Sequence, residues 1–347
     1  MIDFRYHLVS IVAVFLALAI GIVLGSTELQ GPVYNALSSA ASRTSSVLQD
    51  KLTNESNELS AAQQSVTADE AWLQANEAGV LHGLLTGQKL LIVTEPGAQP
   101  SVISGLTTAA ADAGATVTGQ IDLSSNFFNP STTTSASLAS LNTSLANQAG
   151  IQLDTTVSLQ QQAAIHVLAS SLLAGASSVG NQNGATSTAS ADTTLQAYGQ
   201  AGYLTVPVGA PAAAKSTVVV LVTPQAIPAD STQDLLAQAL GPIAGELAKS
   251  SSATVVAGST AGSGGGSPIS VLRGNSVSSQ VSSVDDADTT IGQIAVVEAL
   301  HNALAGGKPG AYGRQAGGSP VYPALTPGSA ASTSPSATPS PTKKAKK

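Results

Sequence analysis

One apolar run near the start of the chain constrains its architecture most. Residues 8–25 read LVSIVAVFLALAIGIVLG, and Ser10 carries the only polar side chain among them. A helix of this length spans roughly 27 Å, which is close to the thickness of the hydrocarbon core of a bilayer. We therefore predict a transmembrane helix over residues 8–25, preceded by a short N-terminal segment of residues 1–7.

A cleaved signal peptide is the alternative reading of this run. The segment before it carries Asp3 and a single arginine, Arg5, and the run is longer than the ~7–15 apolar residues of a signal peptide. An uncleaved anchor is therefore favoured. Arg5 and His7 precede the run and Glu28 follows it, which predicts a cytoplasmic N-terminus and an extracytoplasmic main domain on a single-pass protein of the cell membrane.

Four small residues recur at every fourth position of the predicted membrane helix and therefore share one face. Such a stripe lets two membrane helices approach closely, although alanine and glycine are also common in membrane helices generally. The pattern predicts a homo-oligomer or hetero-oligomer packed through Ala13, Ala17, Gly21 and Gly25.

A helical stalk is predicted over residues 33–80, after a break at Gly31-Pro32. Apolar residues repeat there at intervals of seven, which gives one of the two lines of a coiled-coil seam. The companion line is mostly polar, so the seam needs a partner helix, and a lone helix packed on the domain is the alternative. Trp72 is expected to pack near the end of the stalk. The seam residues are Leu52, Leu59, Val66, Leu73 and Val80.

Composition excludes several function classes. Only 10% of residues are charged and the net charge is −7, so the clustered lysine and arginine of a nucleic-acid-binding surface are missing. The chain has no cysteine and a single methionine, which excludes disulfides and the soft sulfur ligands that Cu(I) prefers. The polar but nearly uncharged remainder is typical of an exported protein.

Residues 87–325 alternate strand and helix patterns and predict a doubly wound, mostly parallel α/β domain. The first half places one strand in the run LLIVTEPG at 90–97, closed by Pro96-Gly97, and another at 116–123, around a helix at 100–113. It is followed by an insertion at 131–201, read as two helices and then a loop over 176–200. The second half places strands at 217–224, 252–258, 269–272 and 281–284, with helices at 230–249, begun by Asp230 or Ser231, and at 291–304. A Gly-Ser loop is expected at 262–267, and a disordered tail with a basic end at 326–347.

Acidic residues stand at two predicted strand ends, where this fold usually places ligands. They are Glu95 and the trio Asp285, Asp286 and Asp288. The trio has the oxygen ligands of a hard cation, and helix capping is the alternative role. The sequence has no phosphate-binding loop and no nucleophile elbow, and its four histidines are scattered. We predict no enzyme activity, no catalytic residue and no cofactor.

Several segments together resemble the actinobacterial copper transporter MctB family. They are the run AVFLALAIGIVLGST, the segment ADAGATVTGQIDL and the late block from SSVDDADTTIGQ to KPGAYG. The resemblance covers about residues 1–325. It implies a membrane-anchored copper transport or homeostasis protein of the cell envelope, described as an oligomeric channel or efflux component in the outer membrane, with copper as the transported ligand.

The same resemblance implies an alternative function. Related proteins are described as envelope regulators of cell division that pair through a stalk with a membrane partner protein and control peptidoglycan hydrolysis. The incomplete seam over residues 52–80 and the missing site chemistry favour this non-enzymatic alternative, whereas the family name favours copper. A channel would need several copies of the chain, because one helix cannot enclose a path.

Overall fold

The computed structural model describes residues 4–154, 159–175, 188–207, 215–227, 232–259, 266–314 and 321–324. The chain forms two compact units, Met1–Asp69 and Glu70–Lys347. The predicted disordered tail, the candidate caps Asp230 and Ser231, and most of the expected Gly-Ser loop lie outside the described residues.

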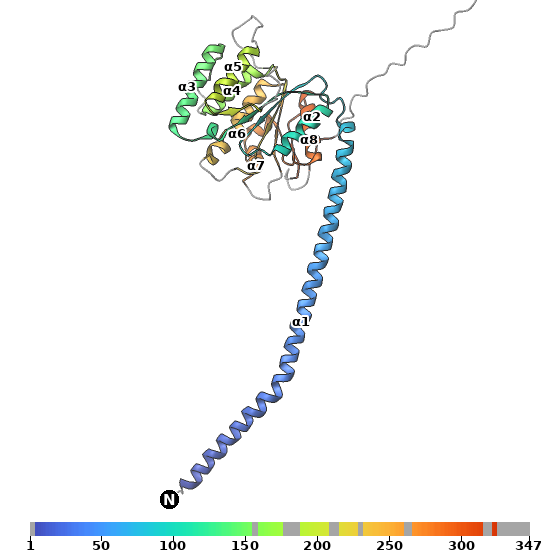
Figure 1. The fold of residues 1–347 in the computed structure, drawn as a ribbon, viewed down its shortest axis with the longest axis vertical. Coiled ribbons are helices and arrows are strands. Elements are labelled where there is room, and N and C mark those ends of the chain that lie inside the picture. The colour runs from blue at the N-terminus through green and yellow to red at the C-terminus, as the bar shows by residue number, and fades with distance from the viewer. Residues whose placement is uncertain are drawn as a thin grey trace, which may run out of the picture. The chain divides into compact units, whose positions relative to one another are not determined.

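The first element is a single helix, α1 (Phe4–Leu81), which runs from the first unit into the second (Figure 1). Its segment Tyr6–Gly25 is long and apolar enough to cross a membrane, with a mean hydropathy of 2.9. The predicted break at Gly31-Pro32 is wrong, because the helix continues through both residues. A proline removes one backbone hydrogen bond and bends a helix, but the bonds on either side can carry the helix past it.

The second unit is built on one seven-stranded sheet in the order β3-β2-β1-β4-β5-β6-β7. All neighbouring strands run parallel except β3, which pairs antiparallel with β2. The prediction of a mostly parallel α/β domain is therefore confirmed. The strands are β1 (Lys89–Thr94), β2 (Thr116–Leu123), β3 (Leu204–Thr205), β4 (Val218–Val222), β5 (Ala253–Ala257), β6 (Ser282–Val284) and β7 (Ala311–Tyr312).

Helices cover both faces of this sheet (Figure 1). One face carries α2 (Pro100–Asp112), α8 (Thr290–Leu304) and the end of α1. The other carries α3 (Thr132–Ala149), α4 (Gln160–Leu172), α5 (Thr188–Gln200), α6 (Gln233–Ser250) and the short α7 (Pro268–Arg273). Single 3-10 turns lie at Ser125–Phe128 and Ser276–Ser279.

The central strands are buried on both faces, which explains their unbroken apolar sequences. Along β4, Val219 and Leu221 belong to the core under α4 and α6, whereas Val218, Val220 and Val222 belong to the core under α2 and α8. The end of α1 joins the second of these cores through Leu81. The last turns of the stalk predicted over 33–80 are therefore part of the domain.

Three local predictions are wrong. Residues 188–200 of the expected loop form α5, because Ala191, Thr194 and Tyr198 bury one face of a polar segment. Residues 269–272 form α7 rather than a strand, since Ile269 and Leu272 are buried three residues apart, as on a helix face. Trp72, expected to pack, is 65% exposed.

Candidate functional site

The strand order places a topological switch point between β1 and β4. The strands that follow β1 in the chain, β2 and β3, lie on one side of this point, and those that follow β4 lie on the other side. Ligands of open α/β sheets bind at such a point, beyond the carboxyl ends of the strands. Glu95 follows β1 directly, and its backbone N–H donates to the carbonyl of Val222 at the end of β4, at 2.9 Å. The sequence-predicted acid Glu95 thus lies at the switch point.

The Glu95 side chain is buried and unpaired. It is 2% exposed, and neither carboxyl oxygen has a hydrogen-bond partner in the described part of the chain. Burial without a compensating charge raises the pKa of this carboxyl to about 8, so that it is mostly protonated at neutral pH. A neutral carboxyl group can donate a hydrogen bond, which an ionised one cannot.

A hollow of about 760 Å³ opens beside Glu95, between the carboxyl ends of β1 and β2 and the helix α2. Asp122, near the end of β2, lies in its wall. The Oδ1 atom of Asp122 accepts hydrogen bonds from the hydroxyl of Thr94 and the amide of Gln120, both at 2.8 Å. Sequence reasoning missed Asp122 because its role depends on β2 lying next to β1.

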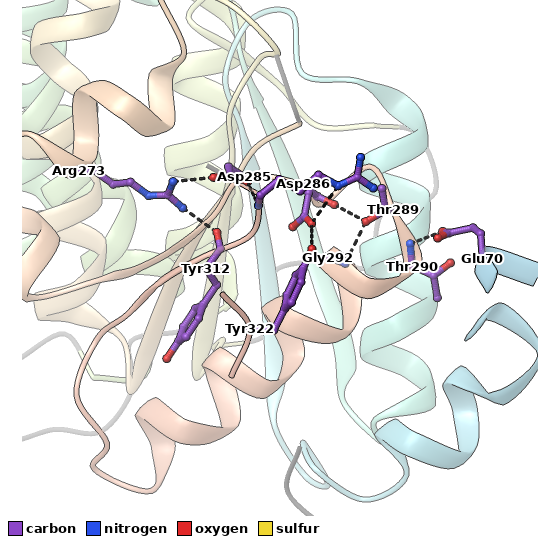
Figure 2. A network of polar contacts seen from close by, with 10 residues as sticks. Glu70, Arg273, Asp285, Asp286, Thr289, Thr290, Gly292, Tyr312 and Tyr322 are labelled. Atoms are coloured by element: carbon purple, nitrogen blue, oxygen red, sulfur yellow. Dashed lines mark hydrogen bonds and ion pairs between the residues drawn. The ribbon is translucent and has the colours of Figure 1, made fainter. Parts of the chain in front are cut away.

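The Asp285–Asp288 trio lies after β6, and Asp285 and Asp286 belong to a separate polar network (Figure 2). The Arg273 guanidinium contacts the Oδ2 atom of Asp285 at 2.6 Å and donates to the carbonyl of Tyr312 at 2.7 Å. The other oxygen of Asp285 accepts from the backbone N–H of Arg314 at 2.7 Å. This carboxylate therefore joins α7, β6 and the segment after β7.

Asp286 is fully buried beside Asp285. The hydroxyl of Tyr322 donates to its Oδ2 atom at 2.5 Å, and the Arg314 guanidinium lies 3.8 Å from the same oxygen (Figure 2). Burial raises the pKa of Asp286 despite the opposing effect of the Tyr322 hydrogen bond. These contacts assign Asp286 a role in holding the segment 321–324 against the domain.

The N-cap residue of the following helix comes directly after the trio. The N-cap of α8 is Thr289, whose hydroxyl accepts from the backbone N–H of Gly292 at 3.1 Å. Asp286 contributes its backbone carbonyl, which accepts from Thr289, and Asp288 is exposed. Two strands, β4 and β5, separate Glu95 from the trio. Within the residues that the structure describes, no three His, Cys, Asp or Glu side chains are grouped so that they could hold a metal ion.

A second polar pocket, of about 230 Å³, lies between α4 and α6. His166 Nδ1 lies 2.6 Å from Glu246 Oε1, and Lys249 Nζ lies 3.2 Å from Glu246 Oε2. The hydrogen bond to Glu246 raises the pKa of His166, and the same bond lowers the pKa of Glu246 to about 2. Sequence reasoning missed this pair, because its members lie 80 positions apart.

The glycines of the membrane helix lie in open space among the residues that the structure describes. A methyl group added at Gly21 or Gly25 would meet no atom within 4 Å. The seam residues divide into two sets: Leu52, Leu59 and Val66 are 60–66% exposed, whereas Leu73 and Val80 pack against the core under α2 and α8. Leu73 and Val80, which belong to the second unit, are therefore part of the domain core.

Comparison with known proteins identifies the family. The family model described as "Copper transport outer membrane protein, MctB" matches residues 1–323. Copper transporter MctB of Mycobacterium tuberculosis and that of Mycobacterium bovis are each 31% identical to this chain over 315 residues, which cover 90% of this chain and 96% of theirs. The protein of the same name from Mycobacterium leprae is 28% identical over 322 residues, with the same coverage. The chain therefore belongs to the MctB family.

Proposed function

We propose that this protein handles copper at the cell envelope as a single-pass membrane protein without enzymatic activity. The observation that carries the proposal is the family match over residues 1–323, together with relatives whose names state copper transport. The residues of this chain limit how copper would pass. The sequence has no cysteine, so copper would meet histidine, carboxylate or backbone ligands rather than thiolates.

The proposal includes self-association. A single apolar helix cannot enclose a polar path, because a path through hydrocarbon needs protein on all sides. Ala13, Ala17, Gly21 and Gly25 offer a flat face for this contact. Because the chain has no cysteine, Ser60→Cys gives a single disulfide cross-linking site. The cross-linked dimer should decrease when Ala17 and Gly21 are changed to leucine, and should persist when Ile20 is changed to leucine instead.

The proposed topology has a cytoplasmic N-terminus and an extracytoplasmic main domain in the cytoplasmic membrane. The family description names the outer membrane, whereas an apolar helical span favours the inner one. Single cysteines at Ile2 and Ser60 separate the two sides. A membrane-impermeant maleimide applied to intact cells should label Ser60→Cys and not Ile2→Cys, and the reverse pattern would overturn this orientation.

A second candidate function is an envelope regulator that binds a partner helix through α1. It is favoured by the exposure of Leu52, Leu59 and Val66, three apolar residues at intervals of seven. The double change of Leu59 and Val66 to aspartate should abolish recovery of the partner from cross-linked cells. The same change at the exposed polar residues Ser56 and Gln63 is the matched control. Equal recovery from both variants would reject the seam as a binding surface.

One genetic experiment separates the two functions. A deletion strain is complemented with the full chain or with a chain lacking residues 40–60, three whole heptads of α1. Rescue of copper tolerance by both chains supports copper handling that is independent of the seam. If deletion leaves copper tolerance unchanged and disturbs septation, copper handling is rejected and the regulator is supported.

A further inference from the structure

Unpaired buried polar atoms gather at the carboxyl edge of the sheet. Among the described residues, the unpaired buried side-chain oxygens include both carboxyl oxygens of Glu95, the hydroxyl of Ser259 and the Oδ1 atom of Asp286. These residues follow β1, β5 and β6 by one or two positions. Native proteins leave few buried polar groups without a partner, so such a concentration calls for a specific explanation. Of these residues, Glu95 lines the hollow described above, whereas Ser259 and Asp286 do not.

The hollow beside Glu95 has the size for an organic ligand. Its volume of about 760 Å³ falls within the range of small-molecule sites, roughly 300–1,000 Å³, and is far larger than an ion requires. It also adjoins β1, one of the two strands at the switch point, where open α/β sheets bind ligands. Size and position therefore both indicate a molecule rather than a metal ion.

The lining of the hollow excludes an anionic ligand. It contains two acids, Glu95 and Asp122, and it includes no lysine, arginine or histidine. Pro100, the first residue of α2, has no backbone N–H to offer a phosphate at the helix N-terminus. A phosphate or carboxylate here would meet negative charge without a compensating cation.

The same lining matches hydroxyl groups, which both donate and accept hydrogen bonds. Thr94 and Gln120 fix the Oδ1 atom of Asp122, and both of these bonds leave its Oδ2 atom free to accept from a ligand hydroxyl. The carboxyl group of Glu95 supplies the opposite capacity, a donor for a ligand oxygen, once its side chain turns toward the hollow, because both of its oxygens are covered in this structure. Hydroxyl side chains of α2, at Ser104, Thr107 and Thr108, complete the wall.

We propose that the hollow formed by Glu95, Asp122 and α2 binds a neutral, hydroxyl-rich molecule, a sugar or another compound with a vicinal diol. Asp122 accepts from the diol, in the position at the end of β2 where sheets of this strand order bind the hydroxyls of a ribose. Glu95 donates to a ring or hydroxyl oxygen. The proposal is independent of copper handling, because no step of the argument uses a metal.

The test uses the full chain in lipid nanodiscs, since many detergents carry sugar head groups. Two neutral probes, an N-acetylglucosamine disaccharide and adenosine, are titrated and followed by saturation-transfer NMR. They distinguish a glycan from a ribose as the source of the hydroxyl groups. Saturable binding of either probe is expected, with the transfer strongest at the sugar protons.

Three variants locate the binding. Asp122→Asn and Glu95→Leu should each raise the Kd at least about tenfold, the effect of losing one good hydrogen bond. Glu95→Gln, which keeps a donor, should bind within a few-fold of the unchanged protein, and Asp234→Asn, an exposed acid of α6, should bind normally. Circular dichroism of each variant verifies folding. If Glu95→Leu does not fold, the comparison of Asp122→Asn with Glu95→Gln and Asp234→Asn still tests the proposal.

Three results would overturn the proposal. The first is the lack of saturable binding of both probes to the full chain. The second is sugar binding that Asp122→Asn leaves unchanged. The third is binding of Cu²⁺ or Ca²⁺ that requires Asp122 while neither sugar binds, because the hollow would then be a cation site.

Discussion

Glu70 accepts a hydrogen bond from the backbone N–H of Thr290 at 2.5 Å (Figure 2). Thr290 is the first residue of α8, so a carboxylate of α1 stands at the positive end of that helix. Leu73, Val80 and Leu81 then bury the inner face of the last turns of α1. The end of α1 is therefore anchored to the domain by both a charge–dipole contact and apolar packing.

Changing Glu70 to alanine should destabilise the protein by about 1 kcal/mol, the usual cost of losing a helix N-terminal cap. The reason is that the Thr290 N–H loses its acceptor. Urea denaturation of the full chain, followed by circular dichroism, measures the change. Glu58→Ala, at an exposed site on the same helix, is the control. Equal midpoints for the two variants would show that the contact contributes nothing.

The buried carboxyl of Glu95 should make stability fall as pH rises. The unfolded chain releases this proton near pH 4.5, whereas the folded chain holds it until about pH 8. Between these values the folded state binds one more proton, so the free energy of unfolding decreases by up to about 1.4 kcal/mol per pH unit. Glu95→Gln should flatten the slope in urea titrations from pH 5 to pH 8, and an unchanged slope would contradict the assignment.

Gly292 should tolerate no side chain. A methyl group there would overlap the carbonyl oxygen of Asp286, a backbone atom that cannot easily move away. Gly292→Ala should destabilise the protein by about 1–3 kcal/mol, as overpacking does. Gly79→Ala is the matched change, because that helical position is open, and it should be neutral or stabilising by about 0.5–1 kcal/mol. Thermal melts should therefore show a lower midpoint for Gly292→Ala and an equal or higher midpoint for Gly79→Ala than for the unchanged protein.

The pKa of His166 should depend on Glu246. Glu246→Gln removes the hydrogen bond that is the main cause of the raised pKa, so the pKa should fall toward 6.5. An NMR titration of the imidazole protons measures this, and Glu58→Gln should leave it unchanged. The pair stabilises the fold most between pH 4.5 and 6.5. Above that window His166 loses its proton, and toward pH 2 Glu246 gains one.

The sequence predicted those elements whose signal is local. The runs LLIVT and VVVLV were recognised as strands because continuous apolar stretches of that length fit a sheet covered on both faces. The polar helix α5 was missed because distant contacts stabilise it, including the hydrogen bond from Tyr198 to Asn142 at 2.7 Å. Strands of two residues, such as β3, are too short to leave a pattern.

The candidate site follows the same rule. Glu95 and the Asp285–Asp288 trio could be placed at strand ends from the sequence alone, since each directly follows a strand-like run. The residues that contact these acids could not be placed from the sequence. Arg273 and Tyr322 reach the trio from outside β6, and Asp122 reaches the hollow from the neighbouring strand. Such pairings depend on sheet order, which hydrophobic periodicity does not specify.

The edges of the sheet limit how this domain can meet other proteins. β3 and β7, at its two edges, have two residues each, so each presents few backbone N–H and C=O groups to an incoming strand. Long bare edges recruit extended peptides and start the growth of aggregates, and short ones prevent both. Strand addition at β3 or β7 is therefore disfavoured, whereas β2 extends beyond its pairing with β3, which covers only Asp122 and Leu123.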